Sequence, residues 1–276
     1  MKLNKLINYI KILIHKTLKF FGLRIHKINR DRSNLDRLHK IFLNEVKSPI
    51  IIDVGANIGQ SINRFKKLNK KAIIHSFEPI KKDFQALQDK FKDDKNIFLN
   101  NIALGEKEYE KKIFPNNLSG SSSFSKLIPK TEWVKQRSST HNINPEEVFD
   151  KEVDCKVMTL DDYCQNKQIQ KIDVLKIDTQ GYEDKVLVGA KKLIENKKIN
   201  YIELEIIFNN IYEKKLNFFE IEKHLTPFGY ELFAIQNPGN LYDDYIFQVD
   251  VIYYNPEALL IDKNYIYEDL NKKFKN

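Results

Sequence analysis

The chain has 276 residues, of which 42% are hydrophobic, so it can bury the core of one large α/β domain or of two small ones. Its formal net charge is +8, and this excess equals the eight Lys and Arg residues of positions 1–30, where no Asp or Glu occurs. The rest of the chain is neutral, which argues against a nucleic-acid-binding protein, because such a protein carries a basic surface on its folded body.

The first predicted element is an amphipathic, cationic helix within residues 1–30. Between Leu3 and Phe21 the apolar residues share one arc at helical spacing, and lysines gather on the opposite arc. These lysines interrupt the apolar run too often for a membrane span or a signal-peptide core. Two interpretations stay open: residues 3–21 lie in an anionic membrane surface, or they dock on the rest of the protein or on a partner subunit.

A second helix and a buried strand follow this segment. The helix is predicted to begin at a capping-box pattern near Ser33 and to end before Pro49. Residues 50–54 are then a run rich in β-branched residues, which is typical of a parallel strand that is buried on both faces. We take this strand as the centre of the predicted sheet.

A glycine-containing turn after this strand is the strongest candidate for a ligand site. Asp53 places a carboxylate at the carboxyl end of the strand, and Gly55 and Gly59 allow a tight turn into a helix over residues 60–68. Asn57 occupies the position where the dinucleotide-binding fingerprint has its second glycine. The turn therefore favours a cofactor with amino, ribose and cationic groups over a diphosphate.

The second and third predicted strands also end in polar residues. Glu78 follows the apolar run 72–77, where its carboxylate can accept hydrogen bonds from the two hydroxyls of a ribose. The alternative is that Glu78 only favours the start of the next helix through the helix dipole. Residues 97–105 form the third predicted strand and its exit, where Asn101 and Ile102 can face an adenine.

Residues 106–152 have no regular pattern, and we interpret them as a lid or substrate excursion rather than as a disordered segment. The excursion contains a polar, serine-rich loop at residues 116–124. Phe124, Ile128 and Trp133, the only tryptophan, give it apolar side chains that can pack. A role on the substrate side is therefore expected.

The remaining chain alternates predicted strands and helices, which implies a doubly wound, mostly parallel sheet with right-handed crossovers. The last two strands are close together in the sequence, so they are predicted to form a hairpin at the sheet edge and to give seven strands with one antiparallel member. Residues 159–162 should cap a short helix. The strands predicted here are residues 153–158, 172–178, 200–207, 230–235 and 248–254.

Four sequence blocks, taken in order, resemble the FkbM family of S-adenosylmethionine-dependent methyltransferases. Each block is common by itself, whereas the ordered set is specific, and the resemblance covers roughly residues 50–256. The blocks are Asp53-Val54-Gly55-Ala56-Asn57-Ile58-Gly59, Phe77-Glu78-Pro79, Asn101-Ile102-Ala103-Leu104-Gly105, and Thr159-Leu160-Asp161-Asp162 with Leu175-Lys176-Ile177-Asp178-Thr179-Gln180-Gly181-Tyr182-Glu183.

This resemblance implies a class I methyltransferase (Rossmann-like) fold with S-adenosylmethionine as cofactor. It places Ser122 and Ser123 of the serine-rich loop near the cofactor or the acceptor, and we expect Trp133 of the excursion on the substrate side for the packing reason given above. Gln180 departs from the family, which more often has an acid there. The residues implied to bind the cofactor are Asp53, Gly55, Ala56, Asn57, Gly59, Glu78, Pro79, Asn101, Ile102, Asp178 and Gln180.

Methyl transfer to a hydroxyl needs alignment of donor and acceptor and a base that takes the hydroxyl proton. Asp178 and Glu183 are the two candidate catalytic residues. Each also has a structural alternative, because Asp178 can orient its loop and Glu183 can favour the start of a helix.

The sequence therefore predicts an O-methyltransferase that acts on a sugar, a glycan or a similar small acceptor, as in polysaccharide biosynthesis. We expect a methyltransferase domain at residues 31–256, a C-terminal tail at 257–276, and a cytoplasmic protein that can be peripheral at the inner face of the membrane. The alternatives are an NAD(P)-dependent oxidoreductase, which Asn57 disfavours, a non-catalytic peripheral membrane protein with the same fold, and a tRNA or protein methyltransferase. Neither a nucleic-acid partner nor a metal is expected, because the two cysteines and six histidines have no ligand spacing.

Overall fold

The computed structural model describes residues 34–258 except positions 45, 119, 130, 145–146, 150, 209, 215, 237–240 and 243–244. The predicted helix within residues 1–30 and residues 259–276 of the predicted tail lie outside the described residues. In the part of the chain that is described, no helix is long and apolar enough to cross a membrane.

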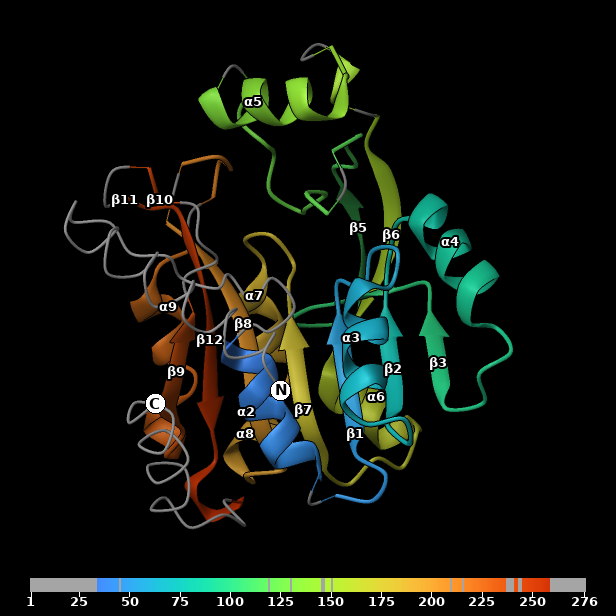
Figure 1. Ribbon diagram of the computed structural model, residues 1–276, viewed down its shortest axis with the longest axis vertical. Coiled ribbons are helices and arrows are strands. Elements are labelled where there is room, and N and C mark those ends of the chain that lie inside the picture. Colours follow the sequence, from blue (N-terminus) through green and yellow to red (C-terminus); the bar gives the residue numbers. More distant parts are fainter. Residues whose placement is uncertain are drawn as a thin grey trace, which may run out of the picture. The chain divides into compact units, whose positions relative to one another are not determined.

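A seven-stranded sheet forms the centre of the fold (Figure 1). Its strand order is β3-β2-β1-β7-β8-β12-β9, and the pairs from β3 to β8 are all parallel. β12 runs antiparallel to both of its neighbours, which confirms the predicted sheet with one reversed strand. The strands are β1 (Ile50–Val54), β2 (Ile73–Phe77), β3 (Ile97–Asn100), β7 (Ile172–Ile177), β8 (Ile199–Ile207), β9 (Glu231–Gln236) and β12 (Gln248–Tyr254).

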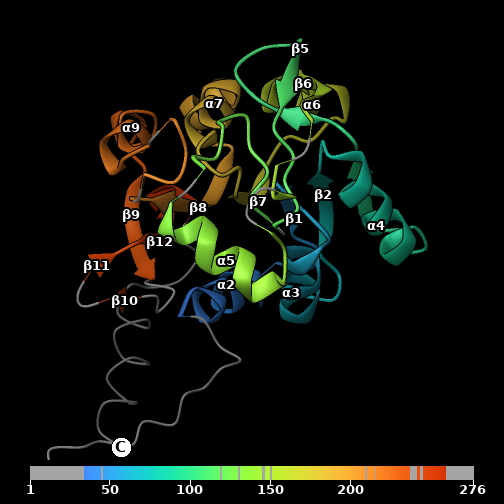
Figure 2. The same ribbon diagram turned by 90° about the horizontal axis from the view of Figure 1, so that it is seen from above.

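Helices cover both faces of this sheet, and Figure 2 shows the strands between the two helical layers. Ile51 packs with the helices of one face and Ile52 with those of the other, so the apolar run of β1 is buried on both sides. One layer contains α2 (Asn34–Asn44), α3 (Gln60–Leu68) and α4 (Lys81–Phe91). The other contains α6 (Leu160–Asn166), α7 (Glu183–Gly189), α8 (Lys191–Glu195) and α9 (Phe218–Glu222).

The predicted irregular excursion contains more regular structure than its sequence pattern indicated. β5 (Tyr109–Ile113) pairs with β6 (Val153–Met158), and β4 (Ala103–Leu104) completes a small second sheet in the order β4-β6-β5. β5 is an edge strand with three charged residues out of five, so it lacks the apolar run that reveals a buried strand. The other short elements are α5 (Glu132–His141), β10 (Leu241–Tyr242), β11 (Tyr245–Ile246) and the 3₁₀-helices Thr226–Phe228 and Pro256–Ala258.

Candidate functional site

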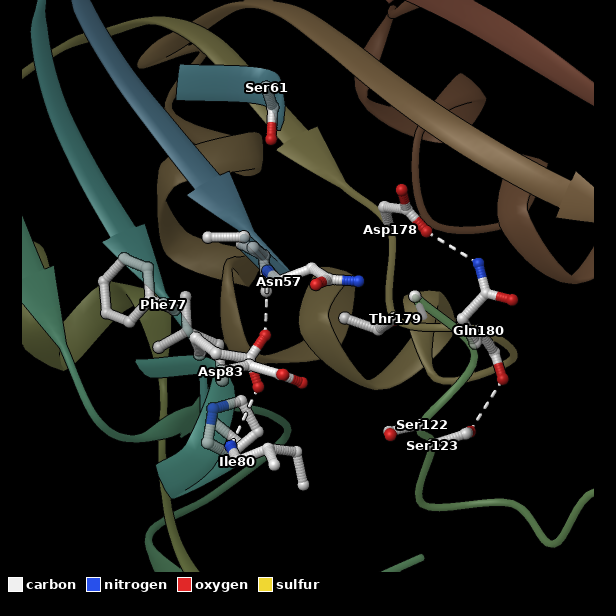
Figure 3. A pocket seen from close by; sticks show the side chains of 18 of the residues that line it. Asn57, Ser61, Phe77, Ile80, Asp83, Ser122, Ser123, Asp178, Thr179 and Gln180 are labelled. Carbon is white, nitrogen blue, oxygen red and sulfur yellow. Dashed lines mark hydrogen bonds between the residues drawn. The ribbon is translucent and has the colours of Figure 1, made fainter. Parts of the chain in front are cut away.

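A cavity of about 330 Å³ lies at the carboxyl ends of β1, β2 and β7. The strand order reverses at β1, which has β2 on one side and β7 on the other. Ligands of open α/β sheets bind at this switch point, and small-molecule pockets have volumes of roughly 300–1,000 Å³. Figure 3 shows side chains from the turn after β1, from the end of β2, from the segment after β7 and from the serine-rich loop around the cavity.

A row of polar side chains crosses the sheet beneath this cavity. Neighbouring strands each contribute one residue to the same face, namely Ser76, Asp53, Lys176 and Glu203. Asp53 Oδ2 accepts hydrogen bonds from the Ser76 hydroxyl at 3.3 Å and from the Ser61 hydroxyl of α3 at 3.0 Å. Its Oδ1 lies 3.7 Å from the Lys176 ammonium. The contacts of Asp53 thus join the three strands β1, β2 and β7 to α3.

Opposite charges balance one another within this row. The Arg64 guanidinium of α3 donates to both carboxylate oxygens of Glu203, at 2.7 and 2.8 Å. Burial alone would lower the pKa of Lys176, but the Asp178 and Asp53 carboxylates outweigh burial and raise it. Asp53 itself is fully buried, which raises its pKa, and it does not line the cavity. Its contact with a cofactor stays a prediction, while its observed contacts fix Lys176 under Asp178.

The turn after β1 requires glycine at its first position. Gly55 has a φ of 83°, and a Cβ on it would lie 1.9 Å from the carbonyl oxygen of Asp178. Asn57 is also left-handed, with a φ of 48°, and lines the cavity together with Gly55 and Ala56. Gly59 lies outside the lining, where its missing side chain leaves room for the ring of Phe91. The two glycines therefore serve different purposes, and only the first shapes the cavity.

Glu78 presents a nearly buried carboxylate to the cavity at the end of β2. It accepts hydrogen bonds from the backbone amides of Asn57 at 2.9 Å and Ile80 at 2.8 Å, one on each oxygen. Each carboxylate oxygen can accept a second hydrogen bond. Burial raises the pKa of Glu78 to about 7, although the two amides favour its ionised form.

Of the residues after β3, which were predicted to face an adenine, Asn101 contacts the turn after β2. The Asn101 side chain donates to the carbonyl oxygens of Glu78 and Pro79, at 2.9 and 3.1 Å, so it supports the turn after β2. Neither Asn101 nor Ile102 lines the cavity, whereas the next residues, Ala103 and Leu104, do. An adenine contact of Asn101 and Ile102 therefore stays a prediction.

Asp178 and Gln180 lie on the segment that follows β7, on the other side of the cavity. The Asp178 carboxylate accepts from Lys176 at 3.1 Å and from the Gln180 amide at 2.7 Å, and 33% of its side chain is exposed (Figure 3). The same Gln180 amide also donates to Glu205 of β8. Burial and the nearby Asp178 and Asp250 carboxylates raise the pKa of Glu205 well above its usual range. Gln180 thus links the Asp178 carboxylate at the cavity to the half-buried carboxylate of Glu205.

Glu183 has a different position from Asp178, although the sequence suggested both as bases. Its side chain is buried and lies outside the cavity lining. One oxygen accepts from the Thr179 amide at 2.9 Å and the Thr179 hydroxyl at 3.0 Å, and the other accepts from the Gly181 amide at 3.0 Å. Burial raises its pKa despite these donors. Glu183 therefore orients the loop that carries Asp178, and its catalytic role stays a prediction.

The serine-rich loop forms a further wall of the cavity. Ser122 and Ser123 both line the cavity, and the Ser123 hydroxyl donates to the Gln180 carbonyl at 2.7 Å. A Cβ on Gly120 would lie 3.0 Å from the Asn57 side chain, so the loop closely approaches the turn. Trp133 lies on α5, stacked on Phe247 with ring centroids 6.4 Å apart, and does not line the cavity. Its role in substrate binding stays a prediction.

Several lining residues were absent from the predicted site. Three of them, Gln60, Ser61 and Arg64, come from the first two turns of α3 and share one face at helical spacing. Asp83 comes from the first turn of α4. The available signal was their position directly after each predicted strand-to-helix turn.

Among the described residues, no three His, Cys, Asp or Glu side chains are grouped so that they could hold a metal ion. Cys155 and Cys164 are both free and buried. Burial raises the thiol pKa of Cys155 to about 11 and that of Cys164 to about 12. Neither is therefore an activated nucleophile at neutral pH.

The chain matches the family model of the methyltransferase FkbM domain over residues 53–232. It is 26% identical over 191 residues to the 2-O-methyltransferase NoeI of Sinorhizobium fredii, an alignment that covers 68% of this chain and 76% of that protein.

Two solved methyltransferase-like structures are also similar. The methyltransferase FkbM from Methylobacillus flagellatus aligns with a TM-score of 0.49 and 15% identity. The alignment covers 75% of this chain and only 44% of that longer chain. Aeropyrum pernix fibrillarin, solved with S-adenosyl-L-methionine bound, aligns with a TM-score of 0.38 and 11% identity, covering 79% of this chain and 74% of that chain.

Proposed function

Because the chain belongs to the FkbM methyltransferase family, a family that uses S-adenosylmethionine, we propose that it transfers the methyl group of this cofactor to a hydroxyl of a sugar or glycan. The observation that carries the proposal is Asp178, a carboxylate exposed to the cavity and held at both oxygens. A group fixed in this way can take a hydroxyl proton without losing its orientation. The relative from S. fredii, a 2-O-methyltransferase, supports oxygen as the acceptor atom.

The residues around the cavity fit the cofactor. Glu78 offers unused acceptor capacity of the kind that two ribose hydroxyls require. Gly55 has no side chain, so its backbone lies close to the Asp178 carbonyl and leaves the backbone of the turn open to a ligand in the cavity. Carboxylates of Glu78 and Asp83 line the cavity and suit a cofactor that carries amino and sulfonium charge. We therefore assign cofactor binding to the glycine turn and to Glu78.

The bound cofactor supplies an electrophilic methyl group. The protein has to align the acceptor hydroxyl, exclude water and receive a proton. Asp178 receives that proton in our proposal, while Lys176 and Gln180 hold its carboxylate in place. Ser122 and Ser123 lie in the adjoining wall, where the Ser122 hydroxyl can donate to an acceptor oxygen. Such a positioned base contributes about a hundredfold or more to the rate.

The proposed function is tested by following labelled methyl transfer from S-adenosylmethionine to a set of neutral monosaccharide and oligosaccharide glycosides. We expect a labelled sugar ether with at least one acceptor, and its formation should be about a hundredfold or more slower with the Asp178→Asn variant. Product sites can be located by periodate resistance or by NMR. Transfer to none of the sugars, combined with tight cofactor binding, would contradict a sugar acceptor.

The predicted ribose contact of Glu78 makes cofactor affinity depend on pH. The pKa of this carboxyl is raised from its ordinary value of 4.5 to about 7, so its stabilising contribution to the folded protein is present at low pH and is lost as the pH rises through 7. Cofactor binding needs the opposite, ionised form. We expect the dissociation constant to rise about tenfold between about pH 8 and about pH 6, because the ionised fraction falls from about nine tenths to one tenth.

Calorimetric titration at a series of pH values measures this dependence. The isosteric Glu78→Gln variant carries no titratable group at this position, so it should bind more weakly and with a flat pH profile. A profile for Glu78→Gln that keeps the wild-type slope would show that another group is responsible.

We further propose that residues 3–21 bring the enzyme to an anionic membrane surface, where lipid-linked sugars are accessible. Support comes from the amphipathic and cationic sequence of this segment. Deletion of residues 1–28 should release the protein from vesicles that contain anionic lipid while leaving cofactor binding unchanged. Co-sedimentation with anionic and with neutral vesicles measures the effect, and unchanged binding after deletion would rule out this role.

A further inference from the structure

A second cavity, of about 310 Å³, lies behind the serine-rich loop. Asn116, Ser121 and Ser125 of this loop region line it, whereas Ser122, Ser123 and Phe124 of the same loop region line the first cavity. The two cavities therefore share a wall that is one segment of chain thick. We call the second cavity the outer subsite.

Backbone pairing holds the walls of the outer subsite in place. Phe114 pairs with Ser123, and Asn116 pairs with Phe149, in two antiparallel bridges. The Asn116 side chain also accepts from the Ser121 hydroxyl at 2.6 Å and from the Leu118 amide at 3.0 Å. The backbone at Phe149 is thus paired with the serine-rich loop region, which also forms a wall of the first cavity.

The lining of the outer subsite combines aromatic rings with carboxylates. Phe149 is 37% exposed. The Lys126 ammonium lies over the Phe114 ring, 5.0 Å from the ring centre. Glu152 and Glu213 add two carboxylates, and Lys126, the single lysine of the lining, lies 3.8 Å from Glu152. Rings present a face that attracts weakly positive C–H groups, and carboxylates accept hydrogen bonds from hydroxyls.

This chemistry suits a neutral sugar ring, which has C–H groups on its faces and hydroxyls around its edge. The two carboxylates of the lining disfavour a phosphate or a nucleotide, because like charges repel at short range. The volume of the first cavity also supports a second sugar-binding position. The first cavity is at the lower end of the range of roughly 300–1,000 Å³ for drug-sized ligands, so a bound cofactor leaves little room for an acceptor with more than one sugar ring.

We infer that the outer subsite binds the sugar unit next to the one that is methylated, so that the enzyme prefers a neutral oligosaccharide to a monosaccharide. The inference rests on the proposed function and extends it to the length and charge of the acceptor. Phe149 packs against a face of this second unit, and Glu213 accepts hydrogen bonds from its hydroxyls.

The test compares kcat/KM for a neutral methyl glycoside with that for the disaccharide that extends it, using labelled S-adenosylmethionine. Wild type should prefer the disaccharide about tenfold, mainly through KM, because one stacked ring and its hydrogen bonds contribute on this scale. Phe149→Ala should bring this ratio close to one, and Phe149→Trp should restore it. Glu213→Gln, which changes a surface-exposed side chain, should reduce the ratio without affecting folding.

Phe219→Ala is the matched control, because Phe219 is a phenylalanine that is 76% exposed on α9 and lines neither cavity. It should leave both kcat/KM values at the wild-type level. Equal values for the two acceptors in wild type, or a disaccharide preference that survives both Phe149→Ala and Glu213→Gln, would overturn the subsite while leaving the proposed function intact. Transfer to neither sugar would instead count against the proposed function, and the subsite would fall with it.

Discussion

Replacement of Asp178 by Asn should lower kcat for methyl transfer about a hundredfold or more, because the amide cannot take the proton of the acceptor hydroxyl. The substitution preserves shape, and Lys176 keeps Asp53 as a partner, so the fold should persist. Cofactor affinity should stay near the wild-type value. Single-turnover rates and calorimetry on the same preparation separate the two effects.

The Asp178→Asn experiment also distinguishes the two roles that the sequence left open for this residue. If the variant loses cofactor affinity while its rate with saturating cofactor stays normal, Asp178 is a cofactor ligand and not the base. Asp89→Asn, a change on the exposed face of α4, is the control for a lost surface charge.

Replacement of Gly55 by Ala should destabilise the protein by about 3 kcal/mol or more and abolish cofactor binding. A left-handed backbone costs a residue with a Cβ about 1–2 kcal/mol, and a Cβ 1.9 Å from the Asp178 carbonyl forces the two backbones apart. Because Asp178 moves with its backbone, the candidate base would be displaced as well. Urea denaturation and calorimetry measure the two effects.

Gly229→Ala is the matched control for this prediction. Gly229 is also left-handed, with a φ of 76°, but a Cβ there would meet only the flexible side chain of Lys197, 3.3 Å away. It should cost about 1 kcal/mol and leave cofactor binding unchanged. Equal losses of stability in the two variants would mean that the contact with Asp178 contributes nothing beyond backbone strain.

The strands β1, β2 and β7 at the centre of the sheet could be predicted from the sequence because each is a mainly apolar run that is followed directly by glycine or an acid. The glycine turn, Glu78 and Asp178 were predicted for the same reason, since each directly follows such a run. The structure places all three at the cavity. Position along a strand was therefore enough to locate these residues.

Residues whose role depends on register or on distant packing were less predictable. Asp53 was predicted to contact the cofactor; its pairing with Ser76 and Lys176 places it in the buried row beneath the cavity, and its cofactor contact stays a prediction. Whether a strand residue faces a ligand or the core depends on partners that the local sequence does not reveal. Trp133 was expected on the substrate side because it gives the excursion an apolar side chain that can pack, and its partner is Phe247, more than a hundred residues away.

Calorimetric titration with S-adenosylmethionine tests most directly the central claim, that the cavity at the ends of β1, β2 and β7 binds the methyl donor. We expect saturable binding that Glu78→Ala weakens about tenfold or more, through loss of a charged acceptor, and that Asp89→Ala leaves unchanged. NAD should give no heat of binding. The claim would be contradicted by no heat of binding with S-adenosylmethionine, by a Glu78→Ala variant that binds this cofactor as tightly as wild type, or by measurable binding of NAD.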